Sequence, residues 1–241
     1  MPHSHIVSSF DDELNNLRQK IIKMANLVET QFKEAELSLI NNDLDLAKKV
    51  KITDDIVDEM EREIERLSIE MIALRSPLAD DLREIISAIK ISNALERIGD
   101  YAKNLSKRVA VLSKTDKIIS TSIISQMIDV ISTMNRDIID AYIHSNSEKA
   151  ISVWTRDLVV DNLYNSFFRE LLTYMMENPQ YITPATHLLF IAKNIERAGD
   201  HLTNIAELVY FIVEGKAIEI VRPKGDESSK ANVTVDDINT E

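Results

Sequence analysis

The chain contains the same motif twice, and this internal repeat restricts the folds that it can adopt. Residues 93–100 read Asn-Ala-Leu-Glu-Arg-Ile-Gly-Asp, and residues 193–200 read Lys-Asn-Ile-Glu-Arg-Ala-Gly-Asp. A shift of 100 residues places Glu96 on Glu196. Self-similarity over this distance in a chain of 241 residues favours two similar units. We therefore predict two tandem copies of one structural unit.

Apolar residues around each motif are spaced alternately by four and three residues. This spacing is typical of a long helix with a single buried seam. Both copies of the motif are therefore expected on long helices. The matching seam residues are Ile91, Leu95, Ile98, Ala102, Leu105 and Val109 in the first copy and Ile191, Ile195, Ala198, Leu202, Ile205 and Val209 in the second.

Breaks in the apolar periodicity divide the chain into six helices. A polar run at 41–43 interrupts the first stretch, and prolines follow Ser76 and Asn178, where they push the preceding residue out of the helical region. Gly215 is placed to end the last helix. The predicted helices span about 10–40, 44–75, 80–113, 124–141, 148–177 and 184–214.

The composition agrees with long helices, since the chain has only four glycines and five prolines and therefore few turns. We predict an all-α fold of two tandem, structurally similar three-helix bundles, with six long antiparallel helices. The predicted divisions are an N-terminal arm (1–9), a first bundle (10–113), a second bundle (114–215) and a flexible polar tail (216–241). Gly99 and Gly199 lie inside helices at a cost of about 1 kcal/mol each, which predicts close approach by a neighbouring backbone.

Charge and cysteine content exclude several classes of function. The formal net charge is −12 and no basic run occurs, so the chain lacks the electrostatic signature of a nucleic-acid-binding protein. The absence of cysteine excludes disulfides, thiolate metal sites and a cysteine nucleophile. No apolar run approaches the roughly 20 residues that span a bilayer. We expect a soluble, cytoplasmic protein.

An acidic pattern is repeated together with the motif. Glutamate, aspartate and asparagine recur one helical turn apart on the face opposite the seam, and each preceding helix carries an Asp-x-x-x-Asp pair. Carboxylates four residues apart on a helix repel each other, so a cation is expected to offset the arrangement. The candidate ligands are Glu96, Asp100, Glu196 and Asp200, with Asp54, Asp58, Asp157, Asp161, Asn104 and Asn204 as further candidates.

Two interpretations of this pattern stay open. In the first, the carboxylates form a surface cluster of oxygen ligands, a set that suits hard cations such as Mg²⁺, Mn²⁺, Ca²⁺ or iron and favours them over zinc. In the second, the carboxylates pair with Arg97, Arg197 or lysines of neighbouring helices, which contributes little at an exposed site.

The remaining polar and aromatic residues do not point to catalysis. His144, His187 and His201 are not duplicated and are expected at the surface or at an interface, and Trp154 is expected to pack. The sequence contains no nucleophile elbow, P-loop or zincin helix. We therefore expect no enzymatic activity.

The duplicated motif, the two Asp-x-x-x-Asp pairs and the stretch 171–177 resemble the PhoU family of bacterial phosphate-transport accessory proteins. The resemblance covers about residues 10–215. It implies two similar three-helix bundles, often forming a homodimer, peripheral to the inner face of the cytoplasmic membrane. It also implies negative regulation of phosphate uptake and of the phosphate-starvation response, through contacts with the ATPase subunit of the phosphate ABC transporter and with a sensor histidine kinase.

The resemblance further implies metal at the duplicated motif, with iron, manganese, magnesium or zinc as the metals seen in the family. These metals would map onto Glu96, Asp100, Glu196 and Asp200. Two alternatives of other classes are a metal-free helical interaction scaffold and a metal-dependent phosphohydrolase, for which the sequence offers no general acid.

Overall fold

The computed structural model describes residues 3–115, 119–219 and 225, and within them it is all-helical, with no β-strand. This confirms the predicted fold class. The helices are α1 (His3–Asn41), α2 (Leu44–Arg75), α3 (Ala79–Leu112), α4 (Ser122–Ile143), α5 (Ser147–Glu177) and α6 (Ile182–Glu214), and the short 3₁₀ helix η1 (Pro179–Tyr181) precedes α6.

Local chemistry explains where several of these helices begin and end. The Asp43 side chain accepts hydrogen bonds from the backbone N–H groups of Asp45 and Leu46, so that it caps α2. At the other end of α2, Ser76 adopts a left-handed conformation (φ 52°) directly before a proline. Gly215 ends α6 with φ 70°, as predicted, because glycine has no Cβ to oppose this conformation.

The N-terminal end of the chain differs from the prediction, and most of the predicted C-terminal tail is not described. Helix α1 begins at His3, so the predicted arm of residues 1–9 is already helical from its third residue. Of the predicted tail, 216–241, only residues 216–219 and 225 are described, and the rest lies outside the described residues.

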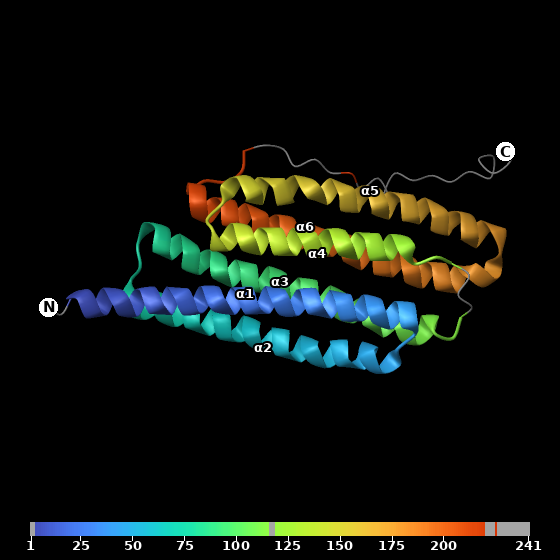
Figure 1. Cartoon of the computed structure of the whole chain (residues 1–241), viewed down its shortest axis with the longest axis horizontal. Coiled ribbons are helices and arrows are strands. Elements are labelled where there is room, and N and C mark those ends of the chain that lie inside the picture. The colour runs from blue at the N-terminus through green and yellow to red at the C-terminus, as the bar shows by residue number, and fades with distance from the viewer. Residues whose placement is uncertain (1–2, 116–118, 220–224, 226–241) are drawn as a thin grey trace.

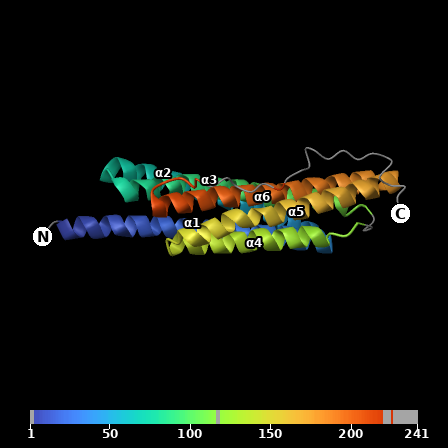
Figure 2. The same ribbon diagram turned by 90° about the horizontal axis from the view of Figure 1, so that it is seen from above.

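The six helices form two three-helix bundles that lie side by side (Figures 1 and 2). Helices α1, α2 and α3 pack on one another in the first bundle, and α4, α5 and α6 do so in the second. Between the bundles, α1 packs on α4 and α3 packs on α6. Each of these pairs joins equivalent helices of the two repeats, so the bundles are related by an approximate twofold axis.

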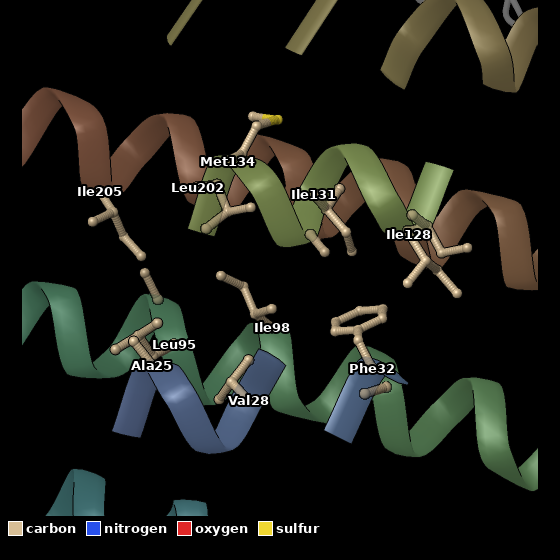
Figure 3. Packing of buried hydrophobic residues seen from close by; sticks show 14 of the residues in the cluster. Ala25, Val28, Phe32, Leu95, Ile98, Ile128, Ile131, Met134, Leu202 and Ile205 are labelled. Carbon is tan, nitrogen blue, oxygen red and sulfur yellow. The ribbon is translucent and has the colours of Figure 1, made fainter. Parts of the chain in front are cut away.

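Apolar side chains form one continuous core through both bundles. Figure 3 shows Phe32 of α1 and Ile98 of α3 facing Ile131 of α4 and Leu202 of α6 across the boundary between the bundles. All four side chains are buried, and so are the predicted seam residues of both motif helices. The bundles therefore share their hydrophobic stabilisation.

Polar contacts also cross the boundary between the bundles. The side-chain amide of Asn135 donates to the Ala25 carbonyl oxygen over 3.1 Å in a buried position. Tyr101 and His201, which occupy equivalent positions in the two repeats, meet each other with 3.4 Å between Oη and Nε2. Burial lowers the pKa of His201, which favours the neutral ring at this interface.

No helix in the described part of the chain is long and apolar enough to cross a membrane.

We predict that replacing Phe32 with alanine destabilises both bundles together. Phe32 is 2% exposed and lies at the boundary between the bundles, so its removal should cost about 3–5 kcal/mol. Urea unfolding followed by circular dichroism should show one transition, shifted to lower urea. Ile52→Ala, at a position that is 65% exposed, is the control and should change the free energy of unfolding by less than about 0.5 kcal/mol. Two separate transitions, of which only one shifts, would show that the bundles unfold independently.

Candidate functional site

The predicted carboxylates lie on two pairs of packed helices, one pair in each bundle. We call Asp54 and Asp58 of α2 with Glu96 and Asp100 of α3 the first acidic cluster. The equivalent residues of the second repeat are the second acidic cluster. It comprises Asp157 and Asp161 of α5 with Glu196 and Asp200 of α6. The clusters thus lie where α2 packs on α3 and where α5 packs on α6.

Four of these carboxylates are buried, three on the preceding helices and one, Glu196, on a motif helix, so the predicted surface cluster is largely covered. The exposed fraction is 1% for Asp54 and Asp157, 4% for Asp161 and 5% for Glu196. The seam of a helix covers only part of its circumference, and α3 and α6 each pack against helices on more than one side. The face opposite the seam is therefore partly covered by the preceding helix of the same bundle.

The motif glycines make room for the buried aspartates. A Cβ atom on Gly199 would lie 2.4 Å from Asp157 Oδ1, and one on Gly99 would lie 3.5 Å from Asp54 Oδ1. The sequence predicted close approach by a neighbouring backbone at these positions. The nearest atoms are instead side-chain oxygens, Asp157 Oδ1 of α5 at Gly199 and Gln31 Oε1 of α1 at Gly99, which a sequence pattern on one helix does not reveal.

A lysine that the sequence analysis did not single out joins the first acidic cluster. Lys103 Nζ donates to Asp54 Oδ2 and, over 2.8 Å, to Asp100 Oδ1. Burial alone would lower the pKa of Lys103, but the hydrogen bonds and charges of the two aspartates outweigh it and raise the pKa. Arg97, the partner considered in the sequence analysis, approaches Asp100 only to 3.9 Å. The spacing of Lys103 three residues after Asp100 was the available signal.

Glu96 completes the first cluster and has the neighbouring Arg97 as its ion-pair partner. Burial, and then the charge of Asp100, raises the pKa of Glu96, while Arg97 opposes this at 3.5 Å. Burial likewise raises the pKa of Asp54, although Lys103 opposes it. The first cluster therefore favours additional positive charge or bound protons.

The second acidic cluster has different neighbours. Lys193 Nζ lies 3.0 Å from Glu196 Oε2, and Thr203 occupies the position equivalent to Lys103. The backbone N–H of Gly225 donates to Asp161 Oδ2 over 2.7 Å, and the Asn165 side-chain amide donates to the Gly225 carbonyl oxygen. A residue of the predicted tail thus reaches the cluster, which no pattern in the sequence indicated.

The oxygen atoms of the acidic clusters suit a hard cation, but the side chains are not arranged as a coordination shell. Among the described residues, no three His, Cys, Asp or Glu side chains are gathered as a metal ion requires. However, Asp54 Oδ1 and Gln31 Oε1 are buried oxygens without a hydrogen-bond partner, and both lie beside Gly99. Oxygen acceptors of this kind are the ligands of hard cations. Metal binding at the motif therefore stays a prediction.

The two asparagines among the candidate ligands have other contacts. Asn104 Oδ1 accepts a hydrogen bond from Lys107 over 3.1 Å. Asn204 lines a separate cleft beside Trp154 and His201, with a volume of about 530 Å³. Trp154 is buried, as predicted, and its Nε1 donates to Glu207. The role of the two asparagines as ligands stays a prediction.

The predicted positions of the three histidines agree with the structure. His201 contacts Tyr101, and His187 Nδ1 lies 3.2 Å from Arg108 Nη1, so both histidines lie between the repeats. His144 is at the surface, with 65% of its side chain exposed.

We predict that Gly199→Ala destabilises the protein more than Gly99→Ala. The new Cβ would overlap Asp157 Oδ1, and overpacking of about 1–3 kcal/mol should exceed the gain of about 1 kcal/mol from alanine in a helix. At Gly99 the nearest atom is the end of the flexible Gln31 side chain at 3.0 Å, which can move. Urea unfolding of both variants provides the comparison. Equal effects, or stabilisation by Gly199→Ala, would contradict this account of the motif glycines.

We predict that Glu96→Gln stabilises the metal-free protein near pH 7 by about 0.5 kcal/mol, because it removes a like-charge pair with Asp100. The pKa of Glu96 is raised above its usual 4.5 in the folded protein. Protonated Glu96 therefore contributes fully to the free energy of unfolding below pH 4.5, and this contribution is lost as pH rises through the folded-state pKa. The advantage of glutamine should therefore shrink toward pH 4. Thermal melts in chelator at several pH values measure it, and an advantage independent of pH would refute the electrostatic origin.

Several known proteins are similar to this chain in sequence. The family model described as "PhoU domain" matches residues 21–109 and 124–209. The phosphate-specific transport system accessory protein PhoU homolog of Rhizobium meliloti is 44% identical over 238 residues, covering 98% of this chain and 100% of the relative. The homolog of Zymomonas mobilis is 46% identical over 212 residues, covering 88% and 90%.

Solved structures agree with these sequence matches. The crystal structure of PhoU from Pseudomonas aeruginosa has a TM-score of 0.83 at 36% identity and covers 86% of this chain and 100% of that one. The phosphate transport system regulatory protein PhoU from Streptococcus pneumoniae has a TM-score of 0.81 at 27% identity, covering 88% and 100%. Matches to both repeats and over nearly the full length of these relatives show that the chain belongs to the PhoU family.

Proposed function

We propose that the protein is a regulatory accessory component of a phosphate-specific transport system, which limits phosphate uptake and represses the phosphate-starvation response. The support is the family to which the chain belongs. Its relatives match this chain over nearly their whole length and are named phosphate-specific transport system accessory proteins. The observation that carries the proposal is the pair of acidic clusters, held at equivalent helix contacts in a fold shared with PhoU structures.

In this proposal the protein acts as an adaptor without enzymatic activity. Its partners are the ATPase subunit of the phosphate ABC transporter and a sensor histidine kinase, and it works as a homodimer in the cytoplasm at the inner face of the membrane. Two rigid bundles with a common core suit an adaptor, since they fix the distance between two binding surfaces. Buried carboxylates that contact lysine and glycine suit binding and positioning better than they suit turnover.

We also propose that the acidic clusters bind a hard metal ion such as Mg²⁺, Mn²⁺ or iron. Burial, and then repulsion from Asp100, raises the pKa of Glu96, and a cation would offset both effects. Carboxylate oxygens are the preferred ligands of such a cation. A chain with net charge −12 would meet repulsion at an anionic membrane, and metal ions bridging carboxylates to lipid phosphates would reduce it.

A metal-free scaffold is the competing function, and the contact of Lys103 with Asp54 and Asp100 favours it for the first repeat. In that case the carboxylates serve to hold α2 against α3, and signalling depends on other surfaces.

We predict that the double variant Asp100→Asn, Asp200→Asn loses repression of a phosphate-starvation reporter in a host deleted for its own PhoU-family gene. The adaptor needs charge at both clusters, and the amides remove it with little change in shape. Asp45→Asn, at a fully exposed side chain remote from the clusters, is the control and should repress normally. Thermal melts of the purified variants show whether they are folded. Normal repression by the folded double variant would favour the metal-free scaffold.

A further inference from the structure

The cleft beside Trp154 and His201 belongs to neither acidic cluster. It opens where α3 packs on α6, with further walls from α5 and from the residues that follow α6, and its volume is about 530 Å³. Leu208, Phe211 and Ile218 give it an apolar wall. Pockets of roughly 300–1,000 Å³ with apolar walls and a few polar groups typically hold a small organic ligand.

The protein itself supplies an aromatic ring at the equivalent place of the other repeat. The shift of 100 residues places Lys90 on Phe190 and Leu208 on Arg108, and both Lys90 and Leu208 line the cleft. The guanidinium of Arg108 lies over the ring of Phe190, with Cζ 4.3 Å from the ring centroid. The cleft lacks both the ring and the cation that covers it. The space between α3 and α6 therefore suits an aromatic ring brought by a ligand.

One end of the cleft carries a positive charge. Lys90 is exposed, and its ammonium forms no ion pair with any described residue. It is the only lysine or arginine among the described residues that line the cleft. Since Arg83 lies beside Gly215 and Tyr101 contacts His201, α3 and α6 are antiparallel, and Lys90 lies opposite the part of α6 near Phe211. A lysine ammonium in such a position binds phosphate oxygens.

The other end of the cleft offers hydrogen-bonding groups. Asn204 is two helical turns from Phe211 along α6, a distance of about 10 Å, and its amide is both a donor and an acceptor. Glu207 lies between them and accepts a hydrogen bond from Trp154 Nε1 over 2.9 Å. Its carboxylate can accept further hydrogen bonds. Asparagine amides and carboxylates are groups that recognise the edges of nucleobases.

We infer that this cleft binds a nucleotide, with the base near Asn204 and Glu207 and the phosphate at Lys90. The base takes the place that the Phe190 ring has in the other repeat. This inference goes beyond the proposed function and does not depend on metal binding at the acidic clusters.

The test uses the fluorescence of Trp154, which is the only tryptophan of the chain and lines the cleft. The full-length protein is titrated with AMP and with GMP in chelator, with excitation at the red edge of the tryptophan absorption, where nucleotides do not absorb. At least one of the two nucleotides should cause a saturable change. Its nucleoside alone, or inorganic phosphate alone, should bind about tenfold more weakly or less, because each makes only part of the contacts.

Three variants assign the binding to the cleft. Lys90→Met should weaken the affinity for the nucleotide about tenfold, because it removes a hydrogen bond between charged groups. Lys51→Met is the matched control, since it removes an exposed lysine of α2 outside the cleft and should bind as the wild type does. Lys90→Phe with Leu208→Arg introduces the ring and cation of the other repeat and should abolish binding. Thermal melts show which variants are folded, and Lys90→Met still provides the test if the double variant is not.

The outcomes are distinct from those of the proposed function. No saturable change with either nucleotide, or equal affinity in the wild type and in folded Lys90→Met, would overturn the inference. A change caused by a short peptide with phenylalanine next to glutamate, and by neither nucleotide, would also overturn it and would identify the cleft as a docking site for a polypeptide. None of these results bears on repression or on the acidic clusters, which are tested through other residues.

Discussion

Asp54 and Asp157 are carboxylates buried in a helix contact, each beside a motif glycine of the next helix, and much of the structure follows from that arrangement. A buried carboxylate is costly unless charge or hydrogen bonds compensate it. The glycine provides the space, and the surrounding polar groups provide the compensation. The recurrence of the pair in both repeats ties the glycine and the acidic residues of the motif to one another.

The apolar core keeps these contacts in place. Helices α3 and α6 each carry two kinds of surface, an apolar seam inside the common core and an acidic side toward the preceding helix. The seam also joins the bundles, with Ile98 and Leu202 among the residues at their boundary (Figure 3). A change in the contact between α2 and α3 would therefore displace side chains at the boundary between the bundles, because close-packed interiors transmit displacement.

Duplication supplied two similar clusters, and substitution made them different. In the first acidic cluster, Lys103 of the motif helix α3 supplies the cation. In the second, Lys193 precedes the motif and the backbone of Gly225 contacts Asp161.

The sequence by itself determined the helices and their pairing into repeats. The spacing of apolar residues predicted both motif helices, proline and glycine marked their ends, and the shift of 100 residues predicted the tandem bundles. These features are local or periodic, so they can be read along one chain. The acidic residues of the clusters were found in the same way, since they recur at matched positions.

Only the tertiary structure decided how those acidic residues are used. The exposure of Asp54 depends on how closely α2 approaches α3, and the contact of Lys103 with two helices depends on their relative rotation. The contact of Gly225 with Asp161 joins positions 64 residues apart. Burial and pairing are set by the packing of whole helices against one another, and periodicity within a single helix carries no information about that distance.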